Sequence, residues 1–343
     1  MGTKIYDIIP KKEIDLKFLN SKVLALDAHL QLYQFLSTIR QRDGSLLTDS
    51  RGNVTSHMTG LFTRTASLLQ KNIKLMFVFD GKPPELKKGE WEKRRQAKAK
   101  AQKKYEAAVA TKDLESMKKY ASRTSRLTKD MINEAKDLIK ALGIPIIDSP
   151  SEGEAQAAHI VKKGHAFAVA TQDADALIFG APRVIKNLAV SGRRKKAGTL
   201  SYQKTKPELI NLADTLNILG IDQDQLVALS MLVGTDYNNG GIRGIGSKNA
   251  LKLVKKHGNN LDALFKEVKW DDSFDFTWTE LFYIIKKMPV TDDYNLKWSE
   301  IDPDKVIEIL CEKHEFSRER IEKTLDKIFK PKSKHQKGLS QWF

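Results

Sequence analysis

Four short apolar stretches, each followed by a segment with helical periodicity, constrain the fold of this chain most strongly. They are residues 23–26, 75–79, 144–147 and 166–170. Strands that alternate with helices predict an α/β fold with a mostly parallel central sheet flanked by helices. Pro145 lacks a backbone donor, so we expect the third stretch to begin a strand or to lie at a sheet edge. A chain of 343 residues, 41% of them hydrophobic, is long enough to bury such a core.

Each apolar stretch runs into an acidic residue. In open parallel sheets the ligand site lies at the carboxyl ends of the strands, so these acids are expected at one crevice. Crowded carboxylates repel one another and take up protons unless a cation neutralises them. Mg²⁺ prefers such oxygen ligands, and two ions ~3.5–4 Å apart can activate water and stabilise the leaving oxygen of a phosphodiester. The acids at the strand ends and close behind them are Asp27, Asp80, Asp148, Glu152, Glu154, Asp173 and Asp175, and Asp236 follows further along the chain.

Taken singly, these acids have simpler interpretations. Asp27 and Asp173 precede helical patterns and could be helix N-caps, and Ser151 with Glu154 fits a capping box. Caps do not explain why a second acid stands two positions from Asp173 and from Glu154. The pattern as a whole therefore favours a metal-dependent site.

The charge balance predicts a polyanionic partner. Lysine and arginine number 59 against 43 aspartate and glutamate residues, a net charge of +16. Such an excess favours nucleic acid, although a basic surface can also serve solubility alone. Residues 85–130 hold 15 basic and 7 acidic residues, half of the surplus, and are helical in propensity. This insertion is either a basic arch that grips phosphates or a solvated helical pair laced with ion pairs.

The remaining segments are simpler to interpret. Residues 206–285 are expected to be mostly helical, with a glycine-rich turn inside, and residues 190–205 to be a mobile basic loop. The turn "GIRGIG" followed by "SKNALKLVKKHG" is typical of a helix-hairpin-helix element, in which glycines let the backbone approach phosphate. The sequence contains no window of 18 uninterrupted apolar residues, so no membrane span is predicted. The single cysteine, Cys311, fits a reducing, cytoplasmic compartment.

Five motifs together resemble one known family. The stretches "VLALDAHLQLYQFL", "VFDGKPPELKKGEWEKR", "PSEGEAQAA", "ATQDADALIFG" and "LVGTDYNNGGIRGIGSKNAL" occur in the order found in flap endonucleases, the structure-specific 5′ nucleases. The resemblance covers essentially the whole chain and is greatest to the archaeal members. It implies a Mg²⁺-dependent endonuclease that also acts as a 5′→3′ exonuclease on nicked or gapped duplex, in replication (Okazaki fragment maturation) and repair.

The resemblance also implies roles for individual residues. Lys87 and Arg94 match a basic catalytic pair; seven positions apart on one helix, they share a face and would stabilise phosphate charge. Asp173 is expected to be essential for cleavage. Seven acids match the ligands of two Mg²⁺ ions per subunit, which Mn²⁺ would replace, and Asp148 has no counterpart among them. They are Asp27, Asp80, Glu152, Glu154, Asp173, Asp175 and Asp236.

The DNA contacts are implied in the same way. Tyr33 matches an aromatic side chain that stacks on a base near the scissile bond; the alternative is a core tyrosine on the helix predicted at 28–40. A K⁺ ion is expected at the backbone carbonyls of Gly241, Ile242 and Ile245. The other expected DNA-binding residues are Arg40, Arg64, Gly244, Gly246, Lys248 and Lys252.

The last residues resemble a binding box for a sliding clamp of the proliferating cell nuclear antigen type. Gln336, Leu339, Trp342 and Phe343 fit the pattern Gln-x-x-aliphatic-x-x-aromatic-aromatic, and one helical turn would gather the three apolar side chains. Expected partners are therefore branched DNA and a clamp, with no membrane, for a monomer associated with the nucleoid.

Two other functions stay open at this stage. A toprim-like or other acidic phosphotransferase also combines a glutamate with Asp-x-Asp, but it leaves the basic insertion and the glycine turn unexplained. A non-catalytic, clamp-bound DNA scaffold is the second alternative. It would be expected to lack some of the seven acids, whereas this sequence has all of them.

The expected regions are 1–105 (nuclease, with the start of the arch), 106–130 (rest of the arch), 131–260 (nuclease, with the helix-hairpin-helix), 261–330 (helical) and 331–343 (tail with the clamp box).

Overall fold

The computed structural model describes residues 3–121, 124–188, 192–195 and 202–329. Its centre is a seven-stranded sheet in the order β1-β9-β6-β5-β2-β3-β4. The five strands from β6 to β4 are parallel. At the other edge β9 pairs antiparallel with β6, and β1 pairs antiparallel with β9. The strands are β1 (Lys12–Glu13), β2 (Val23–Asp27), β3 (Lys74–Phe79), β4 (Ile146–Asp148), β5 (Ala168–Ala170), β6 (Arg183–Lys186) and β9 (Glu208–Asn211).

The predicted α/β class is confirmed, and so are the four predicted strands. The third begins at Ile146, directly after Pro145, and it is the edge strand β4, as a proline requires. Pro145 still contributes its carbonyl, which accepts a hydrogen bond from the Phe77 amide at 3.0 Å.

Helices cover both faces of the sheet. Leu75, Phe77 and Phe79 of β3 pack in the layer formed with α1, α2, α5 and α14, whereas Met76 and Val78 pack in the layer formed with α6, α7 and α9. This alternation is the period of a strand that is buried on both sides. The helices named here are α1 (Ala28–Thr38), α2 (Ser56–Leu69), α5 (Lys129–Ala141), α6 (Gly153–Lys162), α7 (Asp175–Ile178), α9 (Gln223–Val233) and α14 (Arg318–Phe329).

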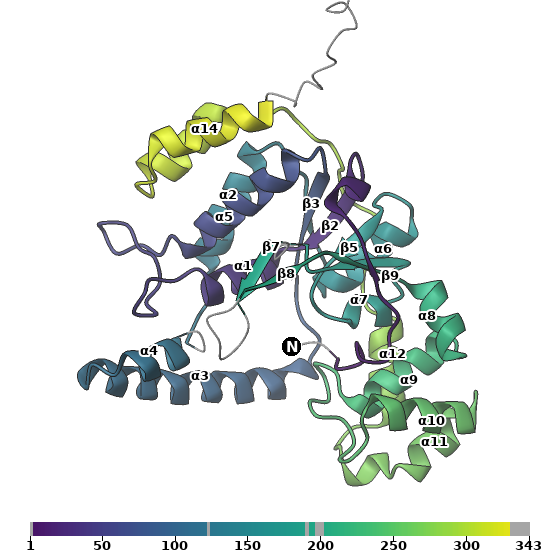
Figure 1. The fold of residues 1–343 in the computed structure, drawn as a ribbon. Helices are drawn as coiled ribbons and strands as arrows, with labels where there is room; N and C mark the ends of the chain where they lie inside the picture. Colours follow the sequence, from purple (N-terminus) through teal and green to yellow (C-terminus); the bar gives the residue numbers. More distant parts are fainter. Residues whose placement is uncertain (1–2, 122–123, 189–191, 196–201, 330–343) are drawn as a thin grey trace, which may run out of the picture.

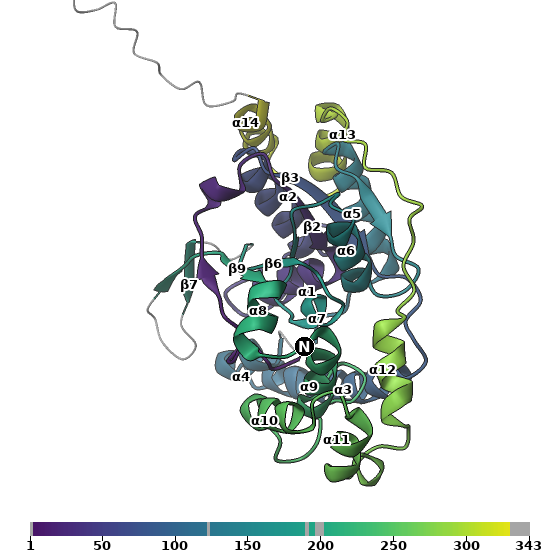
Figure 2. The same ribbon diagram turned by 90° about the vertical axis from the view of Figure 1, so that its right-hand side faces the viewer.

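The basic insertion between β3 and β4 is a pair of helices. The long α3 (Lys87–Ala110) runs along one side of the molecule, and α4 (Leu114–Ala121) folds back against it (Figure 1). Helices α10 (Ser247–His257) and α11 (Leu261–Glu267) form a separate layer beyond α9 (Figure 2). The remaining helices are η1 (Leu16–Leu19), α8 (Leu212–Leu219), η2 (Trp270–Asp272), α12 (Trp278–Lys286), α13 (Pro303–Ile307) and the π-helix η3 (Glu308–Glu312).

Residues 206–285 are mostly helical, as expected, although they open with strand β9, whose apolar pair is too short to show a period. One expectation about secondary structure is wrong: within 190–205, the described residues form a hairpin of β7 (Gly192–Lys195) and β8 (Tyr202–Thr205) in place of a loop. In the described part of the chain, every helix is too short or too polar to cross a membrane.

Candidate active site

The carboxylates gather where the parallel strands end. Asp27 closes β2, Asp80 follows β3 directly, and Asp173 comes three residues after β5. Glu152 is the N-cap of α6, and Glu154 lies in its first turn. Asp175 opens α7, and Asp236 lies in the turn after α9.

The charges of these seven acids act on one another. The pKa of Asp27 lies well above its ordinary value, chiefly because the carboxyl is buried and secondly because of the charge of Asp80. Burial together with Asp175 and Asp173 does the same to the pKa of Glu154. Burial and the charge of Asp236 raise the pKa of Asp175 to about 6. The seven residues therefore form one cluster, named here the acid cluster, in which like charges stand too close together for water to screen them.

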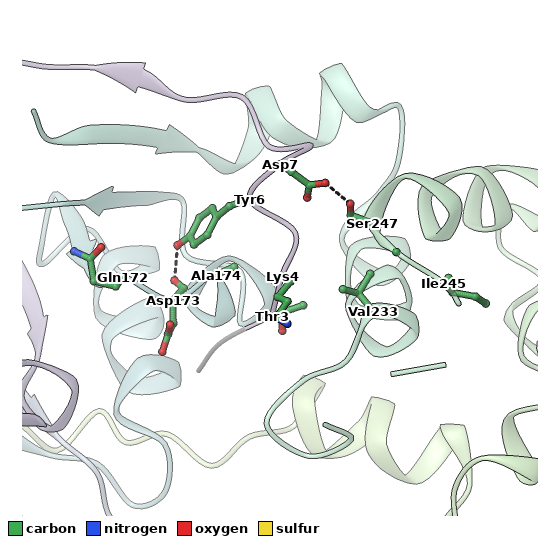
Figure 3. Close-up of a pocket in the computed structure, with 11 residues that line it drawn as sticks. Thr3, Lys4, Tyr6, Asp7, Gln172, Asp173, Ala174, Val233, Ile245 and Ser247 are labelled. Atoms are coloured by element: carbon green, nitrogen blue, oxygen red, sulfur yellow. Dashed lines mark hydrogen bonds between the residues drawn. The ribbon is translucent and has the colours of Figure 1, made fainter. Parts of the chain in front are cut away.

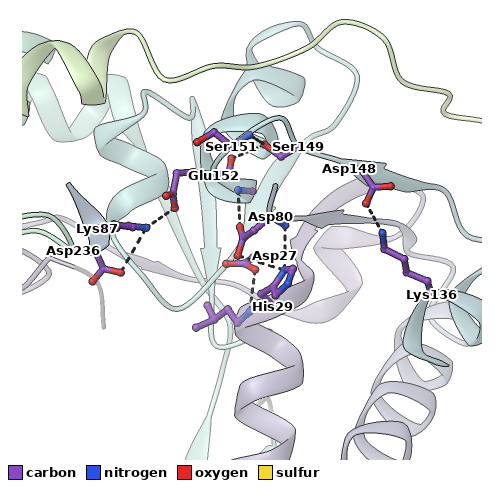
Figure 4. Close-up of polar contacts among 12 residues, drawn as sticks. Asp27, His29, Asp80, Lys87, Lys136, Asp148, Ser149, Ser151, Glu152 and Asp236 are labelled. Carbon is purple, nitrogen blue, oxygen red and sulfur yellow. Dashed lines mark hydrogen bonds and ion pairs between the residues drawn. The ribbon is translucent and has the colours of Figure 1, made fainter. Parts of the chain in front are cut away.

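Asp80 is held by the chain around it (Figure 4). Its Oδ1 accepts a hydrogen bond from the Gly153 amide at 2.7 Å, at the open N-terminus of α6. A Cβ at position 153 would lie 2.7 Å from that same oxygen, so glycine makes room for the carboxylate. The Asp80 amide donates to Nδ1 of His29 at 3.1 Å, and the same nitrogen lies 3.4 Å from Asp80 Oδ2. Asp80 is thereby oriented by neighbours from two other elements.

Thr171 joins two further acids. Its Oγ1 donates to Glu154 Oε1 at 2.6 Å and accepts a hydrogen bond from the Asp173 amide at 3.1 Å. The hydroxyl therefore fixes the end of β5 against the first turn of α6. A supporting role for Thr171 is not predicted from the sequence, although its place just before the acids is a usable signal.

Lys87, the first residue of α3, reaches into the acid cluster. Its Nζ lies 2.5 Å from Glu152 Oε2 and 4.0 Å from Asp236 Oδ2 (Figure 4). Burial alone would lower the pKa of Lys87, but Glu152 and then Asp236 outweigh it and raise that pKa. The pKa of Glu152 is also raised, because its burial outweighs the attraction of Lys87. Lys87 is therefore protonated at neutral pH, in a cluster that holds more negative charge than one ammonium can balance.

The cluster fits a hard divalent cation. Glu152 Oε1 is buried and has no hydrogen-bond partner in the described part of the chain, so it has a lone pair to offer. Carboxylate oxygens are the ligands that Mg²⁺ prefers. As arranged here, no three Asp, Glu, His or Cys side chains of the described residues form a ready-made set of metal ligands. Small movements of these carboxylates would accompany binding.

The structure separates the predicted roles of the acids and caps near the strand ends. Asp148 also ends a strand, but its side chain is 67% exposed and pairs with Lys136 at 2.6 Å, away from the cluster (Figure 4). Asp27 is both a cluster acid and the N-cap of α1, since its side chain accepts from the Leu30 amide. The capping box that pairs Ser151 with Glu154 is wrong: the N-cap is Glu152, and Ser151 Oγ donates to the Lys82 carbonyl.

The predicted DNA contacts lie in different surroundings. Tyr33 is 40% exposed on α1, with Lys98 Nζ 5.1 Å from its ring centre, so it is not a core tyrosine. Arg64 is exposed on α2. Arg40 is tied internally, because its guanidinium donates to the Gly44 carbonyl at 2.8 Å and to Ser125 Oγ at 2.5 Å. Arg94 is part of α3, but its side chain lies outside the described residues.

The glycine turn leads directly into α10. Gly246 is the N-cap of this helix, and Gly244 has a φ of +83°, which a side chain would strain. Lys248 and Lys252 are exposed on the helix. Of the predicted K⁺ ligands, the Ile242 carbonyl accepts a bond from the Ile245 amide at 3.0 Å, and Gly241 packs tightly under the end of α9. The clamp box, residues 336–343, lies outside the described residues.

Comparisons with known proteins agree with this geometry. The XPG N-terminal domain matches residues 5–101, and the XPG I-region matches residues 143–236. The solved catalytic core of Rad2 in complex with DNA substrate shares the fold, with a TM-score of 0.71 at 23% identity over 96% of this chain and 100% of that one. The acidic sheet edge, the lysine within it and the two matched domains define an XPG-type nuclease.

More similar relatives narrow the class. Flap endonuclease 1 of Thermococcus onnurineus is 47% identical over 100% of this chain and 99% of its own length. The same enzyme of Aeropyrum pernix is 45% identical over the full length of both chains. The solved flap endonuclease-1 from Methanococcus jannaschii has a TM-score of 0.75 at 40% identity, covering 96% of this chain and 98% of that one. The chain belongs to the flap endonuclease 1 family.

Proposed function

We propose that the chain is a structure-specific 5′ flap endonuclease that cuts branched DNA and also acts as a 5′→3′ exonuclease on nicked or gapped duplex. The observation that supports this most is the acid cluster with Lys87 inside it, at the base of a basic helical pair. Replication, through Okazaki fragment maturation, and repair both produce such substrates, so we place the enzyme in the cytoplasm, at the nucleoid. We propose that it acts as a monomer.

Nucleases of this family depend on divalent metal ions. We assign two Mg²⁺ per subunit, replaceable by Mn²⁺, to the carboxylates of the acid cluster. Such ions, when bound, supply an activated water and stabilise the leaving oxygen of a phosphodiester. Lys87 carries a proton at neutral pH and is held by Glu152, so it is oriented to donate to the phosphate as charge develops. Arg94, seven residues further along α3, is assigned the same task.

The protein recognises the shape of the DNA through stacking and backbone contacts. Exposed Tyr33 offers a ring on which a base stacks, a contact that tolerates any sequence. The turn at Gly244 and Gly246, with Lys248 and Lys252 beyond it, contacts the backbone of the duplex, as do Arg64 and Arg40. A K⁺ ion at the carbonyls of the same turn would add positive charge there. Recognition of this kind reads a bent junction and ignores base sequence.

Asp173→Ala tests the proposal against a matched control. We expect this variant to bind a 5′ flap junction normally and to lose about a thousandfold or more of its Mg²⁺-dependent cleavage, since several kcal/mol of charge stabilisation disappear. Asp148→Ala removes an acid from the neighbouring strand end, outside the cluster, and should cut like the wild type.

The substrates and conditions separate the other functions. Flap, nicked and single-stranded DNA are compared, with Mg²⁺ and with chelator. A scaffold would bind the flap and cut nothing, and a general phosphotransferase would show no preference for the flap. Unchanged cleavage by Asp173→Ala contradicts the proposed active site.

The C-terminal tail suggests a second partner. We propose that Gln336, Leu339, Trp342 and Phe343 bind a sliding clamp of the proliferating cell nuclear antigen type. A double change, Trp342→Ala with Phe343→Ala, should abolish stimulation by the clamp and leave cleavage without the clamp unchanged. Stimulation that survives the double change would exclude this box as the binding segment.

A further inference from the structure

The segment of residues 3–7 lies between the acid cluster and the glycine turn (Figure 3). It borders a cavity of about 620 Å³, whose other wall comes from the start of α10 and the loop after β5. This segment belongs to none of the five family motifs, yet it lies beside the carboxylates. Its contacts give it a specific task.

Thr3 binds Asp175 twice. Its backbone amide and its Oγ1 both donate to Oδ1 of Asp175, each at 3.0 Å. The Thr3 side chain is buried, with 3% of its surface exposed. Both donors converge on the same oxygen, Oδ1, and so fix the orientation of the carboxylate.

The segment is anchored on either side of this contact. Tyr6 donates its hydroxyl hydrogen to the backbone carbonyl of Asp173 at 2.6 Å, and Ile5 is fully buried. At the far end, Asp7 Oδ2 accepts a hydrogen bond from Ser247 Oγ at 2.6 Å (Figure 3). Ser247 opens α10, directly after the turn assigned to DNA. Thr3 is therefore carried by a segment tied to the loop after β5 and to the DNA-binding element.

Asp175 needs such support. Its neighbours Asp236 and Asp173 repel it, so an unsupported carboxylate would rotate away from the cluster. Residues that orient ligands without touching the metal typically alter metal affinity 10–100-fold when they are removed. The hydroxyl of Thr3 is the part of this support that depends on the side chain, because any residue except proline could supply the amide.

We propose that Thr3 is a positioning residue for cleavage: its hydroxyl holds Asp175 in the orientation that receives a divalent cation, and the Asp7–Ser247 contact keeps Thr3 in place. This inference rests on the proposed function, since it assigns Asp175 to the metal site.

Two variants at position 3 separate the hydroxyl from the shape of the side chain. Thr3→Val keeps the shape and the amide but removes the hydroxyl, whereas Thr3→Ser keeps the hydroxyl. Mn²⁺ binding to the DNA-free protein is measured by the electron paramagnetic resonance signal of free Mn²⁺. We expect Thr3→Val to bind Mn²⁺ about tenfold more weakly and Thr3→Ser to match the wild type.

Cleavage gives a second readout. In single-turnover reactions, Thr3→Val should need about tenfold more Mg²⁺ for half-maximal rate and recover most of that rate at saturation. Ser247→Ala removes the hydrogen bond to Asp7 that anchors the segment, so it should also weaken Mn²⁺ binding, by a smaller factor of about threefold. This variant replaces Thr3→Val as the test if Thr3→Val does not fold.

Normal Mn²⁺ affinity of a folded Thr3→Val, or equal losses in Thr3→Val and Thr3→Ser, overturns the inference. If Thr3→Val does not fold, normal Mn²⁺ affinity of Ser247→Ala overturns it. In each case the proposed function stands if the wild type cuts flaps with Mg²⁺. A wild type that binds no Mn²⁺ and cuts no flap overturns both.

Discussion

Removal of one charge from the acid cluster should make the metal-free protein more stable. In the folded chain the pKa of Asp175 is raised from its ordinary value of 3.8 to about 6, by burial and by Asp236. A carboxyl with a raised pKa contributes stability that is complete below pH ~4 and is lost as the pH rises through about 6. At pH 7.5 Asp175 is therefore ionised and destabilises the metal-free fold.

The size of the effect follows from the two pKa values. The difference between 3.8 and about 6 corresponds to about 3 kcal/mol at ~1.4 kcal/mol per pKa unit. Asp175→Asn keeps an oxygen that can accept from Thr3, so the variant should gain up to about 3 kcal/mol in free energy of unfolding at pH 7.5. At pH 4 the gain should nearly vanish, since the wild-type carboxyl is then protonated.

Guanidinium unfolding of chelator-treated protein, measured from pH 4 to 7.5, tests this. The control is Asp148→Asn, whose exposed side chain should change stability by less than about 0.5 kcal/mol. Saturating Mg²⁺ should reverse the order, because it stabilises the wild type more than the variant. A metal-free Asp175→Asn protein that is less stable than the wild type at pH 7.5, with an unchanged pH profile, would refute the electrostatic argument.

Four other changes have expected results. Lys87→Ala should slow single-turnover cleavage about 10²–10³-fold while Lys100→Ala, an exposed change on the same helix, should not; equal rates would remove Lys87 from catalysis. Tyr33→Ala should cost about 1–3 kcal/mol in binding or positioning the junction, measured by titration and single-turnover rate, and Tyr33→Phe should cost little. A double change of Lys248 and Lys252 to alanine should lower the slope of log affinity against log salt by about 2, and an unchanged slope would place the duplex elsewhere. Burial lowers the pKa of His314 below its ordinary value of 6.5, so stability should fall as the pH drops below about 6.5, and His314→Gln should flatten that part of the profile.

The sequence predicts those parts of the fold that leave a local pattern. The strands at β2, β3 and β5 are apolar stretches buried on both faces, and Pro145 correctly marks the edge strand. Strands β6 and β9 each hold only two consecutive apolar residues, and β1 holds none. Tertiary pairing decides such short segments, so their own residues carry too little signal.

The acid cluster could be predicted for a different reason. A carboxylate is expensive to bury, so several of them placed at the ends of buried strands indicate a cation before any geometry is known. Asp148 shows the limit of this argument: it has the same local pattern, yet it lies at the edge strand and faces solvent. Strand order, which the sequence does not reveal, separates it from Asp27, Asp80 and Asp173.

Supporting residues are harder to predict because they need no special chemistry. Thr3 is 172 positions from Asp175, and its hydroxyl differs from any other only in where the fold places it. The same holds for Gly153, which a helix propensity argument counts as a defect, although its missing side chain leaves space for Asp80. A residue that looks unfavourable in its own helix can therefore be required by an acid 73 positions away. Hydrogen bonds hold the carboxylates of the acid cluster together against their repulsion, and this repulsion destabilises the metal-free fold. Carboxylates held in this way bind a cation more strongly than free ones would.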